Sequence, residues 1–167
     1  SRGLGDVYKR QKVVDAGNSA GRIIFIDNQN YNNGIQLNQI NGPESDLPVT
    51  FIFSALKPVV LTGTITGNVR MFFAGDFQFG MGTETVAYNG LTMFMSNGDM
   101  KICGSIWSDK NNPGGGFLSS DKDITIVESA PFQGQIQCRG NFKTSGMIQF
   151  NDSVLKAPGF TVPKGMK

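Results

Sequence analysis

Short runs of apolar residues alternate with polar ones along this chain, and this period-two pattern predicts β-strands. The run Arg22–Asp27 reads RIIFID and is rich in the β-branched residues that pack well in sheets. In Val59–Thr66, aliphatic and glycine positions share one face of the predicted strand and three threonines share the other. Leu47–Phe53 reads LPVTFIF and is apolar on both faces, which places it in the middle of a sheet. Further strands are predicted at residues 34–40, 69–73, 77–79, 83–88, 91–96, 99–107, 124–127, 135–142 and 147–150.

Two dipeptides predict that the chain reverses direction between strands. Asn97-Gly98 lies between Leu91–Ser96 and Asp99–Trp107, and an Asn-Gly pair suits a type I′ turn because both central residues need positive φ. Gly67-Asn68 has the form of a type II′ turn. Successive hairpins of this kind predict an all-β fold, mainly an antiparallel sandwich or jelly-roll-like domain.

A weak internal recurrence supports a second fold. Val49–Ser54, Leu91–Ser96 and Ile124–Ser129 share the form apolar-Thr-apolar followed by Ser, and each precedes an alternating run that ends near a glycine. The unequal spacing between these copies disfavours a regular solenoid. The alternative fold is therefore an irregular right-handed parallel β-helix.

The composition is consistent with one β domain over residues 12–152. Glycine is abundant, at 22 residues, and charged residues make up only 17% of the chain, which suits sheets with tight turns. The first eleven residues, SRGLGDVYKRQ, resemble a translated library adapter, so they are expected to be a non-native or disordered leader. They hold three of the 15 basic and one of the 13 acidic residues, which leaves the remainder neutral and predicts no nucleic-acid partner. Residues 153–167 are expected to form a tail or linker, and no apolar run approaches the length of a membrane helix.

Catalytic signatures are sparse. The chain has no histidine, which excludes Ser–His and Cys–His nucleophilic pairs and every imidazole metal site, and no cofactor-binding motif occurs. A pair of carboxylates remains possible in principle, as in glycoside hydrolysis, but no spacing singles out a pair. The scattered candidates are Asp76, Glu84, Asp99, Asp121, Asp123 and Glu128.

One loop has a weak resemblance to a calcium site. Asp109 begins a polar stretch with oxygen ligands at alternate positions, and Asp121 and Asp123 follow nearby. However, Pro113 stands where a third ligand belongs, so a polar turn with Asx hydrogen bonds is favoured over a metal site. No metal or other cofactor is predicted.

The two cysteines are predicted to be free thiols. The alternation places Cys138 on the apolar face of its strand, as a small core residue. Cys103 falls on the opposite face of its own strand, beside Lys101 and Trp107. Side chains that face different ways cannot form a disulfide without movement of the backbone.

Three aromatic residues are candidates for sugar binding. Trp107, Tyr31 and Tyr88 lie at strand ends or in Asn-rich loops, where an aromatic ring can stack on a sugar while amides bind its hydroxyls. Asn111 and Asn112 would supply such amides. A covering role for Trp107 and Tyr88 at the end of the core is the competing interpretation.

The sequence favours a role without catalysis and leaves catalysis open. We expect a structural or adhesion module, part of a virion fibre or spike or of an extracellular cell-surface assembly, with glycan bound by loops. Strands that are apolar on both faces also predict a homo-oligomer. The alternative is a fragment of a β-helix carbohydrate-active enzyme, either a glycoside hydrolase or a lyase.

Overall fold

The computed structural model describes residues 13–30, 34–82, 92–107, 115–127 and 129–151. Its strands form three sheets, which we call A, B and C. Sheet A contains β1 (Val13–Asp15), β4 (Gln39–Asn41) and β7 (Ile65–Thr66). Sheet B contains β2 (Ile23–Ile26), β5 (Val49–Phe53), β8 (Val69–Phe73), β10 (Thr92–Ser96), β12 (Gly116–Ser120), β14 (Phe132–Cys138) and β16 (Ile148–Phe150). Sheet C contains β3 (Ile35–Leu37), β6 (Val59–Leu61), β9 (Phe77–Phe79), β11 (Met100–Ile102), β13 (Ile124–Ile126) and β15 (Phe142–Thr144).

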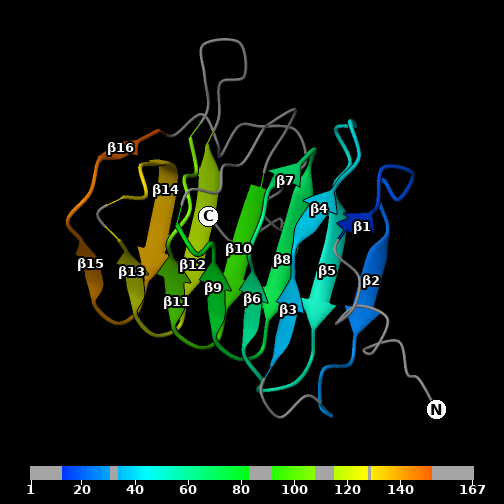
Figure 1. The fold of residues 1–167 in the computed structure, drawn as a ribbon, viewed down its shortest axis with the longest axis horizontal. Coiled ribbons are helices and arrows are strands. Elements are labelled where there is room, and N and C mark those ends of the chain that lie inside the picture. Colours follow the sequence, from blue (N-terminus) through cyan, green and yellow to red (C-terminus); the bar gives the residue numbers. More distant parts are fainter. Residues whose placement is uncertain (1–12, 31–33, 83–91, 108–114, 128, 152–167) are drawn as a thin grey trace, which may run out of the picture.

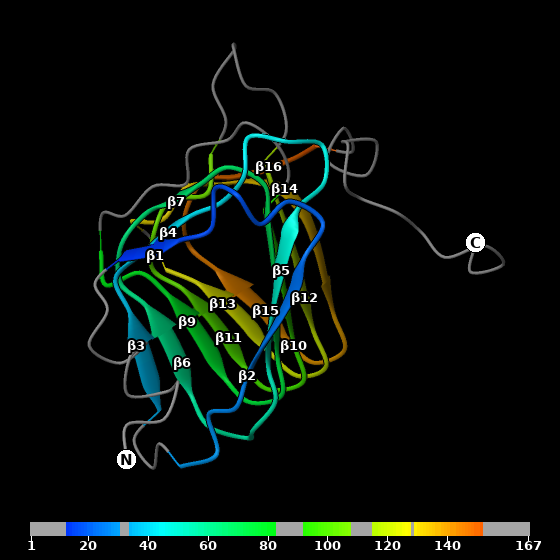
Figure 2. The ribbon, with the colours of Figure 1, turned by 90° about the vertical axis from the view of Figure 1, so that its right-hand side faces the viewer.

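The chain winds as a parallel β-solenoid. Along most of the chain a strand of sheet B is followed by a strand of sheet C, and each pairs with the equivalent strand of the neighbouring coil. Figure 1 shows the colours progressing in sequence order along the solenoid, and Figure 2 shows the sheets as sides around a common interior. Every strand pair in the described part of the chain is parallel. The predicted antiparallel sandwich is therefore wrong, and the alternative of a parallel β-helix matches the structure.

The two dipeptides predicted to form hairpins are corners of the solenoid. Asn97-Gly98 leads from β10 in sheet B to β11 in sheet C, and neither residue has the positive φ that a type I′ turn requires. A Cβ on Gly98 would collide with Asp76 of the preceding coil, so glycine is needed for close approach of two backbones. Gly67 does have a positive φ of 79°, but it turns the chain from β7 in sheet A to β8 in sheet B.

The interior is filled by aromatic and aliphatic side chains from all three sheets. Rings stack along it, with centroids 5.3 Å apart for Phe53 and Phe73 and 4.0 Å apart for Phe73 and Phe77. The ring of Phe94 lies 4.8 Å from that of Phe77 at an angle of 56°. Offset and tilted contacts of this kind stabilise aromatic pairs beyond their buried area. A continuous core thus links the coils and fixes the spacing of the side chains on the outside.

From β8 onwards, the corner between sheets B and C has a constant length of three residues, whereas eight residues separate β2 from β3 and five separate β5 from β6. Residues 74–76, 97–99, 121–123 and 139–141 each join a strand of sheet B to one of sheet C. Inside the corner, Ser96 Oγ donates to Gly75 O at 2.6 Å and accepts from Gly98 N at 2.9 Å. Ser120 Oγ repeats both contacts one coil later, with Gly98 O and with Lys122 N. The hydroxyls therefore satisfy backbone groups that the bend removes from the sheet ladders.

Both cysteines are free thiols in the structure. Cys138 lies in register with Ser120 on the inward face of sheet B and is half-buried. Cys103 is 8% exposed, so its predicted outward position is wrong. The reason is that β11 ends at Ile102 and the chain bends, with the amides of Cys103 and Gly104 both donating to Phe79 O.

Candidate functional site: a carboxylate row on sheet C

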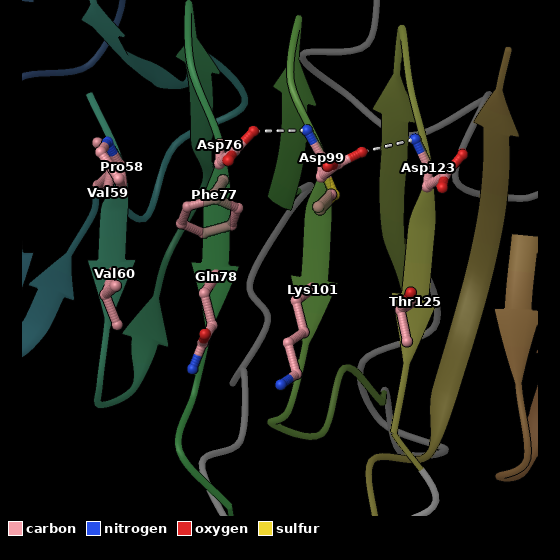
Figure 3. Close-up of a pocket in the computed structure, with 11 residues that line it drawn as sticks. Pro58, Val59, Val60, Asp76, Phe77, Gln78, Asp99, Lys101, Asp123 and Thr125 are labelled. Atoms are coloured by element: carbon pink, nitrogen blue, oxygen red, sulfur yellow. Dashed lines mark hydrogen bonds between the residues drawn. The ribbon is translucent and has the colours of Figure 1, made fainter. Parts of the chain in front are cut away.

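Three carboxylates lie in one row at the edge of sheet C. Asp76, Asp99 and Asp123 each occupy the last position of a three-residue corner, directly before β9, β11 and β13. The following residue points into the core in each coil, so alternation turns each carboxylate outward. Figure 3 shows the three side chains side by side on neighbouring coils.

Hydrogen bonds fix the orientation of this row. Asp76 Oδ1 accepts from Asp99 N at 2.8 Å, and Asp99 Oδ1 accepts from Asp123 N at 3.2 Å. Asp123 Oδ1 accepts from Asn141 N at 2.8 Å, which extends the row by one more coil. Each carboxylate therefore uses one oxygen to bind the next coil, and its rotamer is held in place before any ligand arrives.

A second row lies two residues further along each strand. Gln78, Lys101 and Thr125 are partners in register on β9, β11 and β13, and alternation places them on the same outer face as the carboxylates. Val60 precedes them on β6 and Lys143 follows them on β15. The outer face of sheet C thus carries carboxylate, amide, ammonium and hydroxyl groups in two parallel rows.

The two rows line a hollow of about 550 Å³. Pro58 and Val59 close one end of it, and Asp123 and Thr125 lie at the other (Figure 3). Because neighbouring strands lie about 4.8 Å apart, equivalent groups repeat at that interval along the hollow. A site with this repeat is suited to an extended ligand that presents the same groups at regular intervals.

The predicted glycan site lies almost wholly outside the residues that the structure describes, so it stays a prediction. Trp107 is half-buried beyond the end of β11 and does not line the hollow. Tyr31, Tyr88, Asn111 and Asn112 lie outside the described residues, as do Glu84 and Glu128. No prediction about those six residues is tested.

The weak calcium site is likewise only partly described. Asp109 lies outside the described residues. Asp121 lies 3.6 Å from Arg139 Nε in an exposed ion pair, while Asp123 belongs to the carboxylate row. Within the described ranges, no three acidic or cysteine side chains form a group suited to a metal ion.

The carboxylate row was missed in the sequence because its members are more than twenty positions apart. Asp76 and Asp99 appear unrelated when the chain is read as hairpins, since hairpins place consecutive segments side by side. The signal that would have found them is the tripeptide before the last four strands of sheet C, β9, β11, β13 and β15, which reads AGD, NGD, DKD and RGN in successive coils. This tripeptide recurs at a fixed place in the coil, whereas the apolar-Thr-apolar recurrence does not: Val49–Ser54 begins in sheet B and Ile124–Ser129 in sheet C.

Comparison of the chain with known protein families, with curated proteins and with solved structures gave no match. Among the described residues, no helix has the length and apolar character needed to cross a membrane.

Proposed function

We propose that the protein binds an extended glycan chain along the outer face of sheet C. The observation that carries this proposal is the double row of polar groups, repeated at the strand spacing over β9, β11 and β13. Sugar hydroxyls are both donors and acceptors, and they bind best to preorganised carboxylate, amide and hydroxyl groups of the kind found here.

The composition of the hollow favours a neutral or cationic glycan over a polyanion. The row nearest the corner consists of three carboxylates, each oriented by a backbone amide of the next coil. Lys101 is the one cation among the described residues that line the hollow. A chain of carboxylated or sulfated sugars would meet three like charges, which disfavours its binding.

The test is titration calorimetry against a panel of soluble oligosaccharides with Asp99→Asn as the main variant. The amide keeps an oxygen that can accept from Asp123 N, so the corner is preserved while the charge on the hollow is removed. We expect the affinity for a bound oligosaccharide to fall about tenfold, as for loss of one hydrogen bond to a charged group. Asp121→Asn is the matched control, because it neutralises a carboxylate of the next corner that lies outside the hollow. This variant should bind the oligosaccharide with the same affinity as wild type. Binding that is the same in both variants, or absent for the whole panel, contradicts the proposal.

A second candidate is cleavage of the same glycan by hydrolysis or elimination, favoured by the spacing of the carboxylates. Equivalent positions on neighbouring strands lie about 4.8 Å apart, close to the separation of about 5–5.5 Å between the two carboxyl groups of a retaining glycosidase. Asp76 and Asp99 are neighbours with this spacing, and both face the hollow. A reducing-sugar assay on each bound polysaccharide tests it: catalysis predicts product with wild type and loss of product with Asp99→Asn. An extracellular location, in a virion fibre or a cell-surface assembly, stays a prediction that such an activity would not decide.

A further inference from the structure

The outer face of sheet B carries a row of apolar side chains. Phe25, Ile52, Phe72 and Met95 are partners in register on β2, β5, β8 and β10. Their neighbours along each strand point into the core, so alternation turns this row away from it. Phe25 is 66% exposed and the other three are partly buried.

The row has a cluster of its own, separate from the core. Met93 lies in the adjacent outward row and is 6% exposed, packed against Phe72, Met95 and Phe117. The row that runs from Phe25 to Met95 becomes polar further along the solenoid, where Ser119 and Gln137 follow Met95 in register. Arg70 and Thr50 continue the row of Met93 on β8 and β5. The apolar surface therefore consists of the row from Phe25 to Met95 together with Met93, and polar side chains border it, which is the arrangement typical of a protein interface.

The size of the patch fits the centre of a dimer interface. Four strands about 4.8 Å apart and four or five residues long, at about 3.3 Å per residue, span about 300 Å², and this area includes Thr50 and Arg70 beside the apolar row. A standard interface buries about 800 Å² on each partner, with an apolar centre and a polar rim. The surrounding outward side chains of sheet B would supply that rim.

The patch is also complementary to itself. At one end Phe25 protrudes from β2, and further along the row lies a hollow of about 240 Å³. Ile52, Phe72 and Met95 line its apolar side, and polar residues that include Ser119 and Asp121 line the side toward the corner. A two-fold axis that lies between the two faces and runs parallel to the strands lays the row against itself in the opposite sense, so that Phe25 of each copy faces Met95 of the other. We propose that two copies of the chain pair through this face, with each Phe25 seated in the partner's hollow. The strand spacing is the same on both sides, so Ile52 of each copy then faces Phe72 of the other.

The experiment is sedimentation velocity over a concentration series up to about 100 µM, a range that detects even a weak dimer. We expect wild type to sediment as a species of twice the 18.0 kDa chain mass. Phe25→Lys and Met95→Glu should each weaken the dimer at least about a hundredfold, because each places a charge in the apolar centre of the interface. Gln137→Glu is the matched control, since it adds a charge to the same row beyond the patch and should leave the dimer intact.

Mixing the two variants distinguishes the two-fold arrangement from loss of folding. When a Phe25→Lys chain pairs with a Met95→Glu chain, the introduced lysine faces the introduced glutamate at one contact, and Phe25 faces Met95 at the other. The mixture should therefore form a heterodimer although each variant alone is monomeric. Circular dichroism of each variant confirms that the solenoid is intact. A wild type that stays monomeric at the highest concentration overturns the proposal, as does a dimer that neither substitution affects, or a monomer that instead binds neutral phosphatidylcholine vesicles.

Discussion

The outer faces of sheets B and C are built on the same strand spacing but carry opposite chemistry. Sheet C presents Gln78, Lys101 and Thr125 in register, whereas sheet B presents Ile52, Phe72 and Met95 in register. Both faces are attached to one interior of stacked aromatic rings, so the positions of both rows are fixed by the same core. In a solenoid, each side can therefore acquire its own function without any change to the coil.

The largest expected effect comes from the shared core and tests whether both faces depend on it equally. Phe94 is fully buried and contacts the rings of both Phe77 and Phe79. Phe94→Ala should lower the free energy of unfolding by about 3–5 kcal/mol, because it leaves a cavity between coils. Chemical denaturation measures this loss, and oligosaccharide binding and dimerisation should disappear at the same denaturant concentration. Loss of one before the other would show that the two faces are stabilised separately.

The next largest effect concerns the corner that joins the two faces. Gly98→Val should destabilise the protein by about 2–3 kcal/mol, since its side chain would collide with Asp76 of the neighbouring coil. Gly82→Val is the comparison, because a Cβ there meets no atom within 4 Å. Thermal melts of the two variants should differ clearly, and equal melting temperatures would contradict close approach of the coils at Gly98.

A smaller effect is expected from the serine inside the same corner. Ser120→Ala removes a hydroxyl that donates to Gly98 O and accepts from Lys122 N, and it leaves a backbone carbonyl and amide without this partner. The expected loss is about 1–3 kcal/mol in the free energy of unfolding. Ser54→Ala provides a control, because Ser54 is exposed and its side-chain contact to Ile26 O is 3.5 Å long. A Ser120→Ala variant as stable as wild type would mean that water replaces the hydroxyl.

The substitutions with the smallest expected effect on stability should each impair binding at one face and leave the other face unchanged. Asp99→Asn and Phe25→Gln both alter exposed side chains, so each should change the free energy of unfolding by no more than about 0.5 kcal/mol. The first should weaken oligosaccharide binding and leave the dimer unchanged, and the second should do the reverse. Oligosaccharide binding and dimerisation should be measured on both variants. A variant that loses both properties would show that the two faces depend on each other.

The sequence predicted where many strands lie but not how they pair. The expected strands Val69–Phe73 and Phe77–Phe79 coincide with β8 and β9, because alternation and β-branched or aromatic content are local properties. The relative direction of paired strands is not a local property, because glycine and asparagine occur both in hairpin turns and in sharp corners. Asn97-Gly98 was therefore consistent with either. The pairing partner of β10 lies a whole coil away, and no short window of the sequence contains it.

The predicted strand Val59–Thr66 shows the same limit. In the structure it is divided into β6 and β7 in different sheets, with the bend at Gly63. A Cβ at Gly63 would collide with Asn38 O of the preceding coil, so this glycine marks a corner rather than the apolar face of a strand. The candidate site was inaccessible to prediction for a related reason, since Asp76, Asp99 and Asp123 become neighbours only once the coil period is known.

The constant corner between sheets B and C has a consequence for engineering. From β8 onwards that corner has three residues in every coil, but the path from sheet C back to sheet B has twelve residues between Phe79 and Thr92 and only three between Thr144 and Ile148. The coil therefore accepts return paths of very different length with no shift in strand register. Foreign peptides grafted into the return path of several coils would be displayed in a line at the strand repeat, which makes the chain a scaffold for presenting epitopes about 4.8 Å apart or at multiples of that distance.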